Sequence, residues 1–182
     1  EEAAVQLHDP ARPGAPAPAL IAVACVLQVA LSPQVSILGG TFNFMLVLSL
    51  VLALSRDPGP AAVAGFACGL FFDLTSTAPV GLMALILTLS AFTVSFGSLG
   101  GLNADTMRFI GVAALIANMA YGLCLFLLGD QGDLLWALGG HGISSTVLDL
   151  LAAAIFLAAT ASSSSQRGFS ARGRGTRYKV LK

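Results

Sequence analysis

The chain has little charge for its size. Only 10% of its 182 residues are Asp, Glu, Lys or Arg, whereas 56% are hydrophobic and the mean hydropathy is +0.86. Soluble domains carry about 25% charged residues, and a single water-soluble core of this size could not bury so much apolar surface. The composition therefore argues against a soluble globular enzyme and predicts a one-domain integral membrane protein.

Residues that bind metals or form catalytic sets are also scarce. Cys25, Cys68 and Cys124 lie far apart in apolar runs, which is typical of small packing residues. His8 and His141 have no second ligand at metal spacing. No Ser-His-Asp candidate and no phosphate-binding glycine loop with a lysine occurs. We therefore expect a protein that is not an enzyme, needs no metal or cofactor, and does not bind nucleic acid.

Six apolar segments predict an all-α protein with about six transmembrane helices. A backbone in lipid must satisfy its own hydrogen bonds, and runs without alternation favour helices over barrel strands. Several segments are shorter than the roughly 20 residues that a lipid-exposed span needs, so some helices should be packed among others. The expected segments are Ala17–Ser32, Phe42–Leu54, Pro60–Leu74, Val80–Phe96, Met107–Leu128 and Ser144–Ala161.

The basic residues predict the orientation. With six spans and both termini in the cytoplasm, Arg12, Arg56, Arg108 and the cluster at Arg167–Lys182 all lie inside, as the positive-inside rule requires. We therefore expect a cytoplasmic segment at residues 1–16, a six-helix transmembrane domain at 17–162, and a disordered basic tail at 163–182. The tail would anchor the topology on anionic lipids or bind a cytoplasmic protein.

One aspartate lies in the third segment. Inserting Asp at the centre of a membrane helix costs about 2.5–3.5 kcal/mol, so Asp73 needs a partner or a function. Four-residue spacing places Gly65, Gly69 and Asp73 on one helix face, and small residues at that spacing allow a second helix to approach closely. Two interpretations remain open: Asp73 accepts hydrogen bonds from the Thr75–Thr77 turn, or it binds a ligand or protein partner.

Other polar residues are expected at the same outer level as Asp73. In the six-helix topology Asn43 begins the second helix and Asp149 lies near the start of the sixth. Together with Asp73 they form a shared polar cluster or shallow outward-facing cavity, or they are unrelated residues at helix ends. Asn118 is expected to make an interhelical hydrogen bond, and Trp136 is expected at the outer interface.

The region around Asp73 has a recognisable pattern: a glycine-rich helix ending in Gly-Leu, then Asp, a short polar turn and Pro-x-Gly before the next helix. The matching residues are Gly65, Gly69, Leu70, Asp73, Pro79 and Gly81, followed by Ala84 and Leu85. This pattern resembles the bacterial rod shape-determining MreD family. The resemblance covers about Leu20 to Ser98, and the second half matches only in hydropathy and length. That family often has Pro-Asp at the start of the second helix, where this chain has Phe42 and Asn43.

The resemblance implies a non-enzymatic scaffold or regulator of the cell-elongation complex in the bacterial inner membrane, supporting peptidoglycan synthesis and cell shape. The implied partner is an MreC-like protein, in an assembly with MreB, RodA and a penicillin-binding transpeptidase. The family is also similar in architecture to the six-helix substrate-binding subunits of energy-coupling-factor vitamin transporters, so a small-molecule-binding membrane subunit is the alternative. The candidate structural or partner-binding residues are Gly65, Gly69, Asp73, Pro79, Gly81, Asn43 and Asp149.

Overall fold

The computed structural model describes residues 18–77, 79–98, 106–129 and 133–170, with side chains except at 106–107 and 159–170. These residues form six α-helices, a π-helix and a two-stranded hairpin, which confirms the predicted all-α class. The expected segment 1–16 and the basic tail beyond residue 170 lie outside the described residues. The helices are α1 (Pro18–Ala30), α2 (Phe44–Leu54), α3 (Pro58–Thr75), α4 (Leu82–Ser98), α5 (Thr106–Leu127) and α6 (Ser144–Ser170), with η1 (Trp136–Ile143) as the π-helix and β1 (Ser36–Ile37) and β2 (Gly40–Thr41) as the hairpin.

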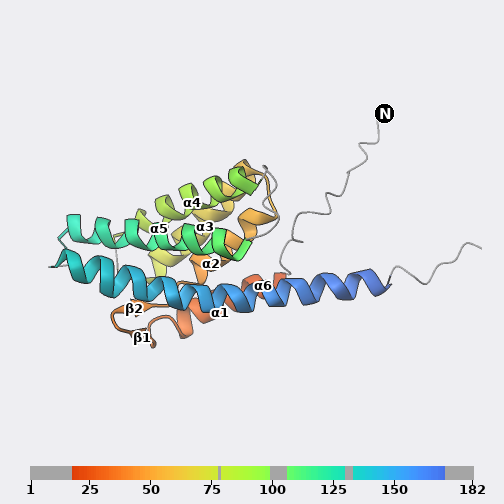
Figure 1. Cartoon of the computed structure of the whole chain (residues 1–182), viewed down its shortest axis with the longest axis horizontal. Coiled ribbons are helices and arrows are strands. Elements are labelled where there is room, and N and C mark those ends of the chain that lie inside the picture. The colour runs from red at the N-terminus through yellow and green to blue at the C-terminus, as the bar shows by residue number, and fades with distance from the viewer. Residues whose placement is uncertain (1–17, 78, 99–105, 130–132, 171–182) are drawn as a thin grey trace, which may run out of the picture.

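The helices run side by side along one long axis, and successive helices point in opposite directions (Figure 1). We call one end of the bundle the hairpin end, because β1 and β2 lie there together with η1 and the C-terminal ends of α3 and α5. The opposite end, which we call the arginine end, holds Arg56 between α2 and α3 and Arg108 at the start of α5. The bundle therefore has two chemically different ends.

Helix α2 is the centre of the bundle. All eleven of its residues are buried, and it contacts α1, α3, α4, α5 and α6. Its sequence, FMLVLSLVLAL, has no polar face, and the hydroxyl of Ser49 donates to Leu46 O at 2.8 Å. An 11-residue helix is only about 16 Å long, and its short length is tolerated because other helices rather than solvent or lipid surround it.

Helices α3 and α4 form the closest pair in the bundle, and glycine makes this possible. A Cβ added at Gly65 would overlap the carbonyl oxygen of Leu87, and one added at Gly69 would overlap the backbone of Ala84. The predicted Gly-x-x-x-Gly face is therefore covered by the next helix of the same chain. The chain reverses between the two helices at Gly81, whose φ of +99° favours glycine.

The stretch between the expected segments Met107–Leu128 and Ser144–Ala161 is not a simple loop. Residues Trp136–Ile143 form a π-helix that continues directly into α6, and α6 itself runs past Ala161 to Ser170. The glycines of this stretch suggested a loop, but Gly142 packs closely on Met119 of α5. Here glycine serves close helix packing rather than a turn, and this reason is visible only in three dimensions.

Two smaller differences concern helix starts and the first loop. Helix α3 begins at Pro58 rather than Pro60, because Pro58 takes the first helical position that proline favours. The stretch between the first two expected segments contains the β1–β2 hairpin, whose turn residues Leu38 and Gly39 have φ values of 52° and 82°. Positive φ at both central residues is the geometry of a tight two-residue hairpin turn.

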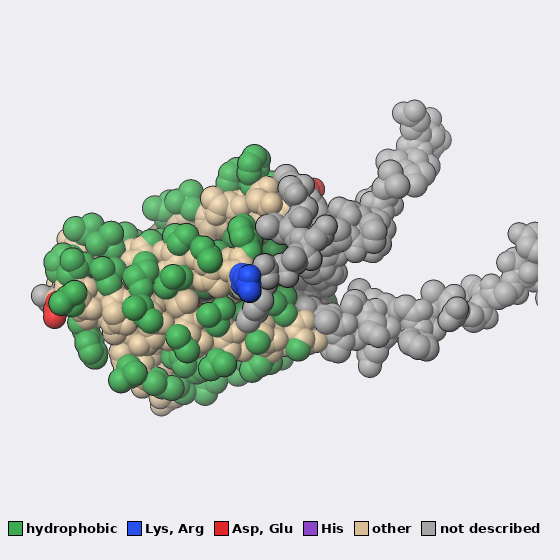
Figure 2. All heavy atoms as spheres, in the orientation of Figure 1, with side chains coloured by type: hydrophobic (Ala, Val, Ile, Leu, Met, Phe, Trp, Pro, Cys, Tyr) green, Lys and Arg blue, Asp and Glu red, His purple; other side chains and the backbone are tan. Residues whose placement is uncertain are grey.

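The outer surface of the bundle is apolar. Two stretches, Arg108–Leu127 and Trp136–Ala158, are long and apolar enough to cross a membrane, and α1, α2 and α4 are apolar but shorter. Large apolar side chains point outward from several helices, such as Val26, Val63 and Ile116, which are 62–70% exposed. Figure 2 shows hydrophobic side chains spread over the whole visible face, with few charged ones among them.

Candidate functional site

Asp73, on the last turns of α3, binds the start of α4. Its Oδ2 accepts hydrogen bonds from the backbone N–H groups of Gly81 at 2.8 Å and Ala84 at 3.0 Å, and its Oδ1 accepts from Met83 N–H at 3.1 Å. The side chain is 1% exposed. The donors are therefore not the Thr75–Thr77 turn, as one expectation had it, but the first backbone N–H groups of the following helix. These groups have no partner within their own helix, and a negative charge there is favourable.

Asp149 of α6 makes the equivalent contact with the start of α2. Its Oδ1 accepts from the backbone N–H of Asn43 at 2.7 Å, and its Oδ2 accepts from the side-chain amide of Asn118 at 2.9 Å. Asn43 is the N-cap of α2, because its own side chain accepts from Leu46 N–H at 2.9 Å. Asn118 thus makes the interhelical hydrogen bond expected of it, from α5 to α6.

The two carboxylate sites are joined through Met83. The amide of Asn43 lies 3.9 Å from the sulfur of Met83, and the backbone N–H of Met83 donates to Asp73. The structure therefore brings Asn43, Asp73 and Asp149 into one layer of buried polar groups, which we call the polar layer. These three side chains are at most 4% exposed, so they do not themselves line an open cavity.

The polar layer organises the backbone. Each carboxylate reaches from one helix to the N-terminus of another: α3 to α4 through Asp73, and α6 to α2 through Asp149. Among the described residues no buried side-chain nitrogen or oxygen lacks a hydrogen-bond partner. This arrangement fixes the mutual positions of four helices. The hydrogen bonds also occupy the carboxylate oxygens of Asp73 and Asp149, through which either side chain would act as a general acid or base.

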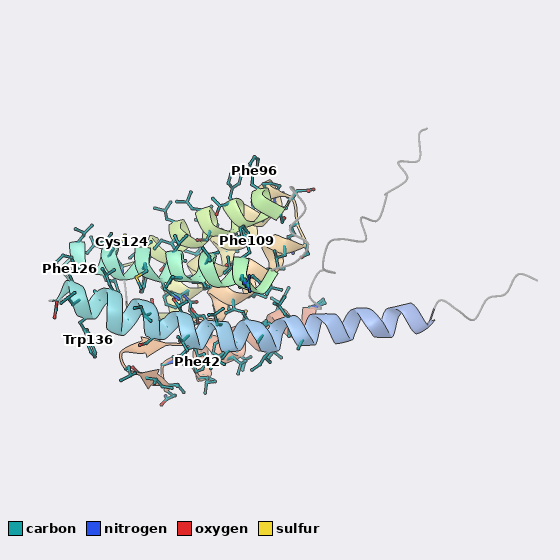
Figure 3. All side chains as sticks on the ribbon, in the orientation of Figure 1. Phe42, Phe96, Phe109, Cys124, Phe126 and Trp136 are labelled. Carbon is teal, nitrogen blue, oxygen red and sulfur yellow. The ribbon has the colours of Figure 1, made fainter. Side chains whose placement is uncertain are left out.

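The remaining predicted residues lie beside this layer. Pro79 is exposed in the turn before α4, where its carbonyl accepts from Leu82 N–H at 3.4 Å. Gly81 supplies the left-handed residue of the same turn. Trp136 is 55% exposed at the hairpin end, and Figure 3 shows it projecting on the side where the hairpin lies. Its placement at a membrane interface stays a prediction.

A cavity of about 350 Å³ opens at the hairpin end, beside the polar layer. Sequence reasoning did not predict this cavity, because its residues come from segments far apart in the chain. Gln28 and Tyr121 were detectable only as polar side chains within apolar helices, and His141 only as an isolated histidine between two expected helices. The lining residues are Gln28, Ser32, Pro33, Thr41, Phe72, Thr75, Ser76, Thr77, Tyr121, Leu125 and His141.

His141 is held in a defined orientation at this cavity. Its Nδ1 lies 2.9 Å from the carbonyl oxygen of Gly39, and because a carbonyl only accepts, Nδ1 carries the proton. Its ring also contacts Tyr121, with centroids 5.8 Å apart. Within the residues that the structure describes, no three His, Cys, Asp or Glu side chains come close enough to hold a metal ion.

Comparisons of the chain with protein-family models, with curated proteins and with solved structures found no match.

Proposed function

We propose that the chain is an integral inner-membrane protein of bacteria that crosses the membrane six times, with the arginine end in the cytoplasm. The apolar outer faces of the bundle support this, as do the positions of the two arginines, because half-buried Arg56 and exposed Arg108 both lie at the arginine end. Of the exposed carboxylates, Asp57 lies at that end and Asp133 at the other. In intact spheroplasts, a membrane-impermeant thiol reagent should label Asp133→Cys but not Arg56→Cys, with the native cysteines replaced by alanine. The reverse labelling would refute the orientation.

Within that membrane the proposed role is a non-enzymatic, MreD-like scaffold of the cell-elongation complex, which binds an MreC-like partner and through it MreB, RodA and a penicillin-binding transpeptidase. The observation that carries the proposal is the use of both buried carboxylates, Asp73 and Asp149, to fix helix N-termini. Within the segment that resembles the MreD family, Asp73 thereby joins α3 and α4 into a rigid pair. Its outward face is apolar, so contact with other membrane helices is the chemistry that the bundle offers.

One surface is suited to such contact. An apolar groove of about 420 Å³ lies between α4 and α5 toward the arginine end, and its lining includes Phe92, Phe96 and Phe109. Packing of apolar side chains and close backbone approach drive helix association in lipid. Phe96 is 64% exposed, so it can contact a partner helix without first leaving the core of the bundle.

The test is recovery of the partner from detergent-solubilised membranes. The tagged chain should recover an MreC-like protein, and normal expression with no such recovery would refute the scaffold role. Phe96→Ala should lower the recovery, whereas Ile155→Ala should not. Ile155 is a matched control because it is 69% exposed and lies on α6, outside the groove. Equal recovery by both variants would refute the groove as the contact surface while leaving the partner itself established.

The second candidate is a small-molecule-binding membrane subunit of an energy-coupling-factor-type transporter. The observation that favours it is the cavity at the hairpin end, which would open to the outside in the proposed orientation. A transport subunit should co-purify with a transport partner and an ATPase rather than with an MreC-like protein. The same recovery experiment therefore separates the two functions.

A further inference from the structure

We propose that the cavity at the hairpin end binds a free, uncharged small molecule that carries a flat heteroaromatic ring. This goes beyond the scaffold role and does not depend on it, because binding in the cavity requires neither the α4–α5 groove nor a partner protein. If the second candidate function holds, the proposal names the ligand class of that function. The argument rests on the shape, polarity and charge of the cavity lining.

Aromatic rings from three separate elements meet in the lining. Phe72 of α3 contacts Tyr121 of α5 edge-on, with centroids 6.0 Å apart and planes at 90°. Tyr121 in turn contacts His141 of η1 at 5.8 Å and 38°. Such rings offer both faces and edges to a further flat ring, and stacked or edge-to-face pairs add about 0.5–1.5 kcal/mol beyond their area burial.

Neutral hydrogen-bonding groups make up the polar part of the lining. Since Nδ1 of His141 donates to Gly39 O, Nε2 of the neutral ring is an acceptor. Gln28 is 4% exposed, and its Oε1 accepts from Met45 N–H at 3.4 Å, while its NH₂ group carries two donors. Hydroxyl groups of Thr41 and Thr77 add groups that both donate and accept. Convergent polar groups of this kind orient a ligand in an otherwise apolar site.

The charge of the lining selects against anions. Its eleven residues include no Asp, Glu, Lys or Arg, and the neighbouring carboxylates of Asp73 and Asp149 are occupied by the hydrogen bonds described above. A phosphate or carboxylate group entering this cavity would lose its hydration, and a neutral His141 ring gives it no counter-charge, which is costly. The cavity therefore fits a nucleoside-like molecule better than the corresponding nucleotide.

The wall that carries His141 is built in an unusual way. The π-helix η1 is eight residues long, although π-helical stretches are rare and are frequent at functional sites. It is held tightly against α5, because a Cβ at Gly122 would lie 2.5 Å from Ala137 O and one at Gly142 would lie 2.7 Å from Met119 Cε. This close packing of η1 on α5 holds the backbone at His141 in place before a ligand binds. The volume of the cavity, about 350 Å³, lies within the range of small-molecule sites.

The experiment uses the full chain in phospholipid nanodiscs and equilibrium dialysis with radiolabelled uridine and adenosine. At least one of these nucleosides should bind saturably with a Kd below about 1 mM. Uridine 5′-monophosphate should bind at least about tenfold more weakly than uridine, because its charge is not matched, and glucose, which lacks a flat ring, should not compete. Binding of neither nucleoside, or stronger binding of the nucleotide or of glucose, would overturn the proposal.

A cavity-filling variant locates the binding. Thr77 lines the cavity and is exposed, so Thr77→Trp should occupy the space without disturbing the core, and it should weaken nucleoside binding at least about tenfold. Val63→Trp places the same side chain at an exposed position of α3, outside both the cavity and the α4–α5 groove, and should bind as the unmodified chain does. Equal binding by both variants would overturn the proposal, and so would native mass spectra in which the unmodified chain carries a phospholipid that Thr77→Trp lacks. Recovery of the MreC-like partner should be unchanged in Thr77→Trp, so the two functions fail or succeed separately.

Discussion

Replacing Asp73 by alanine should separate the start of α4 from α3. The change removes the acceptor of three backbone N–H groups, those of Gly81, Met83 and Ala84. Gly81 is exposed and can turn to water, whereas Met83 and Ala84 are only 1% and 2% exposed. Two buried donors are therefore left without a partner at the N-terminus of a helix.

The expected cost follows from these two donors and from the lost charge. Each buried unsatisfied group costs about 1–3 kcal/mol, and the favourable placement of a negative charge at a helix N-terminus contributes roughly 0.3–1 kcal/mol more. Asp73→Ala should therefore lower the free energy of unfolding by about 2–7 kcal/mol. Asp73→Asn retains one acceptor oxygen but turns an NH₂ group toward an N–H donor, so its effect should be intermediate.

The assay is reversible denaturation in detergent micelles, followed by circular dichroism. Asp133→Ala is the matched control, because Asp133 also accepts a backbone N–H bond, from Leu135 at 3.0 Å, but is exposed. Truncating an exposed cap costs about 0.5–2 kcal/mol. If Asp73→Ala destabilised the protein no more than Asp133→Ala does, the argument that Asp73 joins α3 to α4 would be refuted.

Two further predictions concern the other close contacts of the bundle. Gly69→Ala should lower the free energy of unfolding by about 1–3 kcal/mol, because its Cβ overlaps the backbone of Ala84. Gly59→Ala, where a Cβ meets nothing within 4 Å, should raise it by about 0.4–1 kcal/mol, and similar melting curves for both variants would contradict the packing argument. Asp149→Asn should be strongly destabilising, because its new NH₂ group faces either the NH₂ group of Asn118 or the backbone N–H of Asn43. Adding Asn118→Asp restores a donor–acceptor pair, so a double variant that melts no higher than the additive expectation would exclude direct coupling.

Much of the helix arrangement could be predicted from residue type and spacing. Apolar run lengths predicted six helices, and the run at Phe42–Leu54 was too short for a helix facing lipid, in agreement with the complete burial of α2. The spacing of Gly65 and Gly69 indicated a close helix contact. Local spacing could not show that the contacting helix is α4 of the same chain, because that depends on how the chain reverses at Gly81.

The candidate site was predictable only in part. Residue type alone marked Asp73, Asp149 and Asn43 as polar groups needing partners, because an uncompensated polar group is costly in an apolar environment. Their donors are mostly backbone N–H groups, which every residue except proline carries, so the sequence contains no signal that identifies them. The π-helix was missed for a related reason: the glycines around His141 indicate a loop by local preference, but Gly142 serves close packing against Met119 of α5.

By itself the sequence determined the all-α class, the apolar outer surface and the need to neutralise two buried carboxylates, because these follow from composition and from the free energy of transferring each side chain. Only the tertiary structure decided which groups meet. It directs Asp73 to the start of α4 and Asp149 to the start of α2, and it assembles Gln28, Tyr121 and His141 around one cavity. Such contacts depend on the paths of several helices at once, and no local pattern of residues encodes them.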